Sequence, residues 1–387
     1  MSEWLSAGRI AGQGLGTVVD VVAGMHDAIA QRVESTLPPG AAEVAGLHRA
    51  HAEKVYRRVG AAHRRIPEVL GQLAPTGGQP VSGSRAGQVV LPLVNGLWGD
   101  HLAGADEPLA IRMAVRRDGR DVSDVARAFE RAHPHLVVFI HGLFEDERAW
   151  ESETGSFGAR LERDLDITSL HIRYNSGLRI SENGRLLSGV LDTVVRDWPV
   201  PVASVSLVGH SMGGLVARSA ANQAQDRDWL PLLRTIVTLG TPHLGSPVEK
   251  SVHIGDWALR RVPETRPLGH FITRRSVGIK DLRYGALVTE DWDGHDPDEF
   301  LRDRCTQVPL LDQVTYCWVA ATIAQNSSGT AARMFGDGLV RQASASGNGR
   351  VRRIPFDMGV TVGGVNHLAV MRDDAVYAHL VEWLDPA

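Results

Sequence analysis

Two hydrophobic periods divide the chain. Up to about residue 75, apolar residues return at steps of three and four, which places them on one helical face, as for Val18, Val22, Met25, Ile29 and Val33. From about residue 88, apolar and polar residues alternate or apolar residues run together over a few positions, which is typical of β-strands. The pattern predicts an N-terminal helical segment followed by a sheet.

A glycine- and proline-rich stretch separates the two parts. "APTGGQPVSGSRAGQ" has the composition of a loop rather than of a helix or strand. We therefore expect an N-terminal helical segment over residues 1–75, a linker over 76–90 and a second domain over 91–387.

The second domain is predicted to be α/β. Its "PLAIRMAVRRDGRDV" stretch alternates around an Asp-Gly turn, which indicates a β-hairpin. Buried-strand runs then alternate with helical patterns, which predicts a mostly parallel sheet with helices on both faces. The runs are "HLVVFI", "ITSLHIRY", "VASVSLVG", "LRTIVTLG", "VTYCWVAATI" and "VRRIPF".

One interval breaks this alternation. About residues 247–313 contain no recognisable strand, and a stretch of that length is improbable as a bare loop. We expect a mainly helical cap inserted after the sixth strand, with Trp257 and Phe271 as candidates for substrate contact.

Composition limits the class of protein. The 387 residues are 43% hydrophobic and 22% charged with a net charge of −4, which is ordinary for a globular protein and does not favour nucleic-acid binding. The start of the chain shows neither a secretory leader nor a membrane-spanning run, so we expect a cytoplasmic protein, with a peripheral position at a membrane as the alternative. Cys305 and Cys317 are expected to be free thiols, or one disulfide if the chain is exported.

A candidate nucleophile follows the third of these apolar runs. Gly209-His210-Ser211-Met212-Gly213 matches G-x-S-x-G, in which the serine occupies a strained turn from a strand into a helix. The glycines let that helix begin close to the sheet. The five-residue pattern alone is common, but here the apolar run "ASVSLV" precedes it and the helical "GGLVARSAANQA" follows it. Ser211 is therefore predicted to be a nucleophile.

A serine nucleophile needs a base and an orienting acid. His367 lies in a loop between the last predicted strand and the final helix, which places it at the carboxyl edge of the sheet. Asp337 lies between glycines after "VTYCWVAATI" and is the first candidate for the acid, with Asp357 as runner-up and Asp281 as the choice if the cap supplies it.

Acyl transfer also needs donors for the developing oxyanion. The backbone N–H of Met212 follows the nucleophile, and that of Leu143 follows the strand in "FIHGLF", where Gly142 permits a close turn. His141 is predicted to form hydrogen bonds within this loop and is given no catalytic role.

Several motifs together resemble a known superfamily. "FIHGLF", "RYNSGLRISENG", "LVGHSMGGLVAR", "TLGTPHLGSP", "GDGLV" and "VNHLAV" are similar to the lipase-like branch of the α/β-hydrolases, which includes bacterial triacylglycerol lipases and PGAP1-like esterases. The resemblance covers about residues 90–387 and implies that Asp337 and His367 complete a triad with Ser211. The acidic residue that helps bind calcium after the histidine in the secreted lipases is absent, so we expect no metal and no cofactor.

The expected function is hydrolysis of a carboxylic ester, on a lipid or another small apolar acyl ester. The alternatives are an acyltransferase with the same triad and a non-catalytic binding protein of hydrolase fold. The N-terminal helices are expected to cover the catalytic domain, to associate with a second copy or to rest on a membrane surface. The acidic stretch "EDWDGHDPDE" does not match a calcium loop and is interpreted as a solvated part of the cap.

Overall fold

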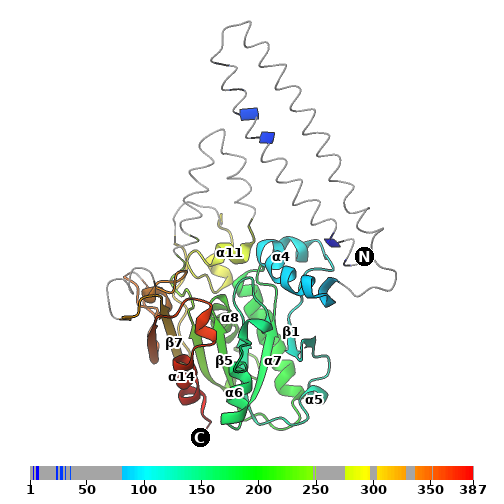
Figure 1. Ribbon diagram of the computed structural model, residues 1–387, viewed down its shortest axis with the longest axis vertical. Helices are drawn as coiled ribbons and strands as arrows, with labels where there is room; N and C mark the ends of the chain where they lie inside the picture. The colour runs from blue at the N-terminus through cyan, green and yellow to red at the C-terminus, as the bar shows by residue number, and fades with distance from the viewer. Residues whose placement is uncertain are drawn as a thin grey trace. The chain divides into compact units, whose positions relative to one another are not determined.

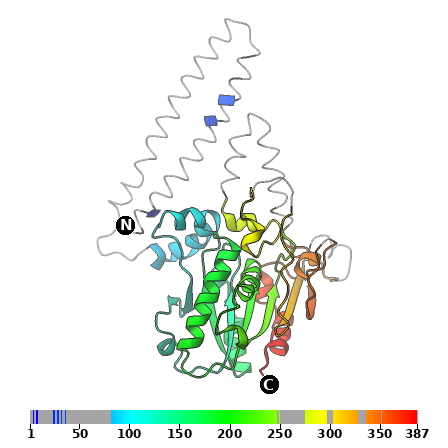
Figure 2. The same ribbon diagram turned by 180° about the vertical axis from the view of Figure 1, so that it is seen from behind.

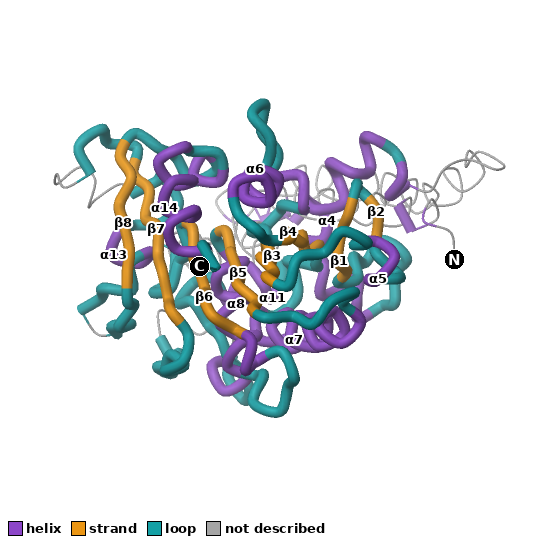
Figure 3. Tube along the Cα trace, turned by 90° about the horizontal axis from the view of Figure 1, so that it is seen from below, coloured by secondary structure: helices purple, strands orange, loops and turns teal. Residues whose placement is uncertain are grey.

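Eight strands form one sheet in the order β2-β1-β4-β3-β5-β6-β7-β8. Every neighbouring pair from β4 to β8 is parallel, whereas β1 pairs antiparallel with both β2 and β4. Figure 3 shows the strands side by side. Their bounds are β1 Ala114–Arg117, β2 Arg120–Asp121, β3 His135–Ile140, β4 Thr168–Arg173, β5 Ser204–His210, β6 Leu233–Leu239, β7 Thr315–Thr322 and β8 Met358–Gly363.

The structure is a computed structural model. It divides into two compact units, and the larger one, residues 92–100, 111–250 and 276–387, holds the sheet. The predicted N-terminal helical face and the cap residues Trp257 and Phe271 lie outside the described residues. The structure describes residues 3, 6, 7, 23, 24, 27, 28, 31, 35, 81–246, 249, 275–296, 303–327, 336–350 and 352–386.

Helices cover both faces of the sheet, as predicted (Figures 1 and 3). Successive side chains of a strand point to opposite faces. Val138 and Ile140 accordingly pack in one buried cluster with α7 and α8, and Val137 and Phe139 in another with α6 and α14. From behind, the green α7 crosses in front of the sheet (Figure 2). These helices are α6 Phe157–Asp164, α7 Ile180–Asp197, α8 Met212–Asn222 and α14 Asp374–Leu384.

Shorter elements occupy the connections. The short helices are α5 Val125–Ala128, α11 Val277–Asp281 and α13 Gln342–Ala345. The 3-10 turns are η1 Val81–Gly83, η2 Glu147–Trp150, η3 Leu230–Leu232, η4 Thr289–Asp291 and η5 Ala369–Met371. Among the described residues between β6 and β7 there are α11 and η4 and no strand.

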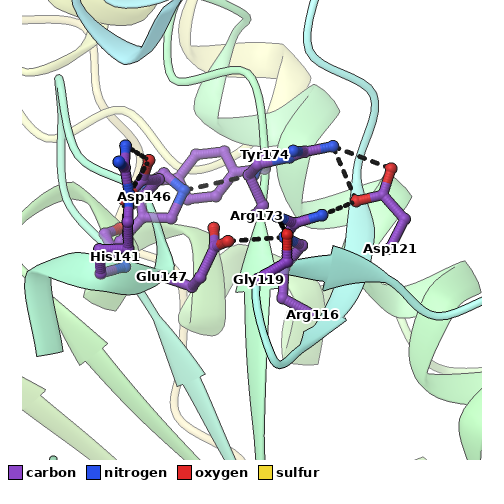
Figure 4. Close-up of polar contacts among 9 residues, drawn as sticks. Arg116, Gly119, Asp121, His141, Asp146, Glu147, Arg173 and Tyr174 are labelled. Atoms are coloured by element: carbon purple, nitrogen blue, oxygen red, sulfur yellow. Dashed lines mark hydrogen bonds and ion pairs between the residues drawn. The ribbon is translucent and has the colours of Figure 1, made fainter. Parts of the chain in front are cut away.

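The predicted hairpin is present at one edge of the sheet. Asp118 and Gly119 turn the chain with φ of 49° and 72°, and an Asp-Gly pair adopts this left-handed conformation readily. Arg116 forms ion pairs with Asp121 of β2 and with Glu147 of η2, and Arg173 of β4 donates to Asp121 at 2.8 and 2.9 Å (Figure 4). These charged contacts join the hairpin to β4.

The predicted linker is wrong over residues 85–90, which instead form the first turns of α4 (Arg85–Gly104). Ser84 caps this helix by accepting a hydrogen bond from Gly87 N–H. Gly87 of that stretch serves close packing instead, since a Cβ there would lie 1.7 Å from the Val81 carbonyl oxygen, and two later glycines of α4 do the same. A Cβ at Gly96 would lie 2.1 Å from the Phe144 ring, and one at Gly99 would lie 1.8 Å from the Asn175 side chain.

The last predicted strand is also misplaced. Over the described residues 352–356 there is no named strand, and an isolated bridge joins Asn348 to Arg353. The last strand is β8, whose Gly359 and Gly363 hid it from the sequence pattern. Gly359 is required by packing, because a Cβ there would lie 2.0 Å from the ring of Trp318 on the neighbouring strand.

Candidate active site

Ser211 occupies a strained turn between β5 and α8. Its φ of 51° and ψ of −119° lie where a residue with a side chain is disfavoured. The surrounding glycines leave no room for a side chain: a Cβ at Gly209 would lie 2.4 Å from Gly214 N, and one at Gly213 would lie 2.2 Å from the Ile140 carbonyl oxygen. The predicted close approach of helix and sheet is confirmed, and it presents Ser211 at the carboxyl edge of β5.

Gly209→Ala is expected to lower the free energy of unfolding by about 1–3 kcal/mol or more, because the added Cβ meets backbone atoms that cannot rotate away. Urea unfolding measures the difference. Gly189→Ala is the matched control, since a Cβ at Gly189 in α7 meets nothing within 4 Å. Alanine favours a helix over glycine by up to about 1 kcal/mol, so this variant should be at least as stable as wild type. Equal losses in both variants would contradict the steric role of Gly209.

Asp337 and His367 meet at the same edge of the sheet. His367 Nδ1 lies 2.7 Å from Asp337 Oδ2, and both side chains are buried. The other carboxylate oxygen, Oδ1, accepts hydrogen bonds from the N–H groups of Leu339 and Val340 at 2.9 and 2.8 Å. His367 N–H also donates to the Asp337 carbonyl at 3.1 Å. Because the carboxylate only accepts, Nδ1 carries a proton, and Nε2 is the ring nitrogen that can act as a base.

The other two candidate acids lie elsewhere. Asp357 accepts a hydrogen bond from Tyr316 N–H at 2.8 Å, at the amino end of β7 and therefore at the opposite edge of the sheet. Asp281 is buried, binds Arg179 and accepts from Ile180 N–H at 3.0 Å, so it holds the start of α7. Burial raises the pKa of Asp281 to about 6. No described contact joins either carboxylate to His367.

Ser211 lies next to this pair. Its N–H donates to the Leu239 carbonyl at 2.8 Å. The residue after Leu239, Gly240, lies so close to Asp337 and His367 that a Cβ on it would be 3.2–3.3 Å from both side chains. Ser211 Oγ makes no hydrogen bond to any described residue. Hydrogen bonds between catalytic groups are often long without substrate and shorten when it binds.

The backbone N–H groups of Leu143 and Met212 were predicted to bind the oxyanion, and both residues lie at the serine turn. Gly142 N–H is bound to Glu145 Oε2 at 2.7 Å, whereas Leu143 N–H has no partner within the described part of the chain. A Cβ at Gly142 would lie 3.1 Å from Ser211 Cβ, which shows how closely this loop packs on the serine. Met212 is the first residue of α8, where N–H groups have no partner within the helix and the dipole favours negative charge. Leu143 and Met212 therefore lie where an oxyanion could be bound.

His141 forms hydrogen bonds around its own loop, as predicted. Its Nδ1 lies 2.8 Å from the Gly142 carbonyl, and its Nε2 accepts from Tyr174 N–H at 3.2 Å. The ring also stacks on Tyr174, with 4.3 Å between centroids (Figure 4). One nitrogen donates and the other accepts, so the imidazole is neutral, and burial lowers its pKa.

Glu145 and His210 form a buried pair beside these groups, and no pattern in the sequence indicated it. His210 Nδ1 lies 2.9 Å from Glu145 Oε2, and His210 Nε2 lies 3.0 Å from the His367 carbonyl oxygen. Burial opposes the charge of His210, but the carboxylate of Glu145 outweighs it and raises the pKa of the imidazole. Burial likewise opposes the charge of Glu145, and His210 reverses this and lowers the pKa of the carboxyl to about 2. Position 210 is free in G-x-S-x-G, so the motif could not reveal the pair.

The remaining candidates have structural roles. Asp291, from the acidic stretch, accepts from Leu287 N–H and from Thr306 N–H, both at 2.7 Å, and so joins two turns. Cys305 and Cys317 are free, and burial raises the pKa of each thiol to about 12. Over the residues that are described, no group of three or more His, Cys, Asp or Glu side chains could hold a metal ion. Over the same residues, no helix is long and apolar enough to cross a membrane.

A strained serine at the carboxyl edge of a parallel sheet, with an aspartate and a histidine after it in chain order, is the arrangement of the α/β-hydrolases. The chain is accordingly a serine hydrolase of the α/β-hydrolase fold. Over residues 130–287 it is similar to the family described as "Putative serine esterase (DUF676)". That segment includes the Leu143 loop and Ser211 and ends before Asp337 and His367, so the assignment of these two residues depends on their geometry.

Three of the solved structures that match this chain are the following. The mature lipase BlEst2 of Bacillus licheniformis is 20% identical with a TM-score of 0.44, over 66% of this chain and 93% of that chain. EstA of Clostridium botulinum is 12% identical with a TM-score of 0.39, over 66% and 88%. The phospholipase PlaB of Legionella pneumophila is 16% identical with a TM-score of 0.41, over 65% and 59%.

Proposed function

We propose that the protein hydrolyses carboxylic esters through an acyl-enzyme on Ser211. His367 Nε2 takes the hydroxyl proton as Oγ attacks the ester carbonyl, and the N–H groups of Leu143 and Met212 stabilise the oxyanion. His367 then gives the proton to the leaving alcohol, and water releases the acid by the same groups in reverse.

One contact carries this proposal. The 2.7 Å hydrogen bond from His367 Nδ1 to Asp337 places a proton on Nδ1 and makes Nε2 the ring nitrogen available as a base, beside the turn that presents Ser211. When the imidazole becomes charged during attack, the carboxylate stabilises that charge.

Exposed apolar side chains beside the acid and base favour an apolar acyl substrate. Leu368 follows His367 and is 56% exposed, Leu339 lies two residues after Asp337 and is 45% exposed, and Ile323 at the end of β7 is 52% exposed. Ile323 N–H bonds to the Gly336 carbonyl, so these side chains come from neighbouring loops. Burial of an acyl chain against them is favourable by about 0.8 kcal/mol per methylene.

A series of p-nitrophenyl esters tests the proposal. kcat/KM is expected to rise from acetate toward longer acyl chains, and Leu368→Ser should reduce it more for a long ester than for acetate. Leu93→Ser, at another exposed leucine in α4, is the control and should change neither. A steady fall with chain length would contradict the apolar substrate, and hydrolysis of no ester would contradict the esterase. Adding alcohol acceptors and analysing products would reveal an acyltransferase.

A further inference from the structure

Three loops that the proposed reaction uses meet at the pair of Glu145 and His210. Glu145 Oε2 accepts from Gly142 N–H, next to the proposed oxyanion donor Leu143, and it also contacts His210 Nδ1. His210 precedes Ser211 in the serine turn, and its Nε2 contacts the main-chain carbonyl of His367. The pair therefore touches the oxyanion loop, the nucleophile turn and the loop of the base.

The contacts of His210 determine its protonation. A carbonyl oxygen and an ionised carboxylate can only accept hydrogen bonds, so both ring nitrogens must donate and the ring is an imidazolium. In a neutral ring, one nitrogen would direct its lone pair at an oxygen 2.9 or 3.0 Å away. His141 provides the contrast, because one of its nitrogens accepts a hydrogen bond from Tyr174 N–H.

Among the charged groups around His210, the carboxylate of Glu145 is the one in direct contact with the ring. The ring is fully buried, and the Glu145 side chain is 12% exposed. The His367 ring lies 4.8 Å away between centroids, Trp150 of η2 lies edge-on at 6.4 Å, and Asp337 acts only through its charge at longer range. Removing one member of a buried ion pair leaves the other charge uncompensated, so each of these two residues depends on the other.

We infer that Glu145 and His210 are positioning residues of the proposed esterase, and that their ion pair holds the Leu143 N–H and the His367 imidazole in register with Ser211. Glu145 fixes the His141–Gly142 peptide, one residue before Leu143, and so limits where the Leu143 N–H can point. His210 fixes the main chain of His367 and so limits where Nε2 can lie. The inference rests on the proposed function, because the groups that it positions are those of ester hydrolysis.

Glu145→Gln tests the role of the ion pair, because glutamine keeps the shape of the side chain and removes its charge. We expect kcat to fall about tenfold or more with little change in KM, a loss below the ~10²–10³-fold that follows removal of an oxyanion donor itself. Glu151→Gln, at an exposed carboxylate that closes η2, is the matched control and should leave both constants unchanged.

The pH dependence of kcat separates a charged pair from simple packing. In wild type, kcat should fall as alkaline pH deprotonates His210 and breaks one of its two contacts. Without the carboxylate, the pKa of His210 is lower, so in Glu145→Gln this alkaline limb should move to lower pH. His210→Asn should lose that ionisation altogether. If kcat fell at the same alkaline pH in all three proteins, the inference would be overturned.

Nitrogen-15 NMR of the histidine rings provides a readout that does not need activity. At pH 7, the His210 signals, identified by their absence in His210→Asn, should show two protonated ring nitrogens in wild type and a shift toward the neutral ring in Glu145→Gln. A neutral His210 in wild type would overturn the ion pair at any level of activity. Ester hydrolysis by wild type with unchanged kinetics in Glu145→Gln would overturn the positioning role alone. Failure of wild type to hydrolyse any ester would remove the proposed function and the positioning role with it.

Discussion

Replacing Ser211 by alanine is expected to abolish ester hydrolysis, with kcat reduced by about 10⁴-fold or more, because alanine lacks the hydroxyl that forms the acyl-enzyme in the proposed reaction. A fluorophosphonate probe should label wild type at one serine and should not label Ser211→Ala. Mass spectrometry of the labelled peptide identifies the site. The substitution removes only a hydroxyl that makes no hydrogen bond to the described residues, so thermal unfolding should show a folded variant.

Ser206→Ala is the matched control for this experiment. Ser206 lies on β5, the strand that leads into the turn, and its side chain is buried rather than presented at the sheet edge. The variant should be labelled and should hydrolyse esters as wild type does. Equal labelling of Ser211→Ala and wild type would exclude Ser211 as the nucleophile.

Asp337→Asn is expected to reduce kcat by about 10³–10⁴-fold, and the reason is a change of tautomer. The N–H groups of Leu339 and Val340 hold Oδ1, so the asparagine carbonyl would occupy that position and its NH₂ would face His367 Nδ1. Nδ1 would then have to accept, the proton would move to Nε2, and the ring could not take the proton of Ser211. Steady-state kinetics on a p-nitrophenyl ester measures the loss.

The two alternative acids serve as controls for that prediction. Asp357→Asn should retain kcat near the wild-type value, because Asp357 lies at the amino edge of the sheet. Asp281→Asn should alter stability rather than proton transfer, because Asp281 binds Arg179 at the start of α7. A large loss in Asp357→Asn beside an active Asp337→Asn would reverse the assignment.

Strands that are covered by helices on both faces of the sheet could be predicted from the sequence. β3, β4, β5 and β6 are short, mostly buried runs covered by helices on both sides, and the sequence places each within one or two residues. The serine turn was readable for a different reason. A Cβ at Gly209 or Gly213 would lie 2.2–2.4 Å from backbone atoms, so only glycine fits at these positions. This steric requirement is visible in the sequence as the fixed spacing of the glycines around the serine.

Other elements depend on contacts that a linear pattern does not carry. Glycines of α4 and β8 weaken the apolar pattern, yet some of them allow a distant side chain to approach, such as Phe144 at Gly96 and Trp318 at Gly359. Glu145 and His210 were missed because their importance arises from a 2.9 Å contact across 65 positions of sequence. From strand order alone Asp337 was the first of three candidate carboxylates, and the resemblance favoured it, but the choice depends on which carboxylate meets His367.

Because the backbone at Ser211 is strained, selection for stability and selection for activity favour different residues at this position. The strain belongs to the turn and not to the hydroxyl, so a glycine at this position would relax the turn while removing the reacting oxygen. A library screened only for heat resistance would therefore tend to enrich inactive proteins at this position. Directed evolution of this chain toward thermostability would therefore need an activity screen in every round, because stability can be gained at the residue proposed as the nucleophile.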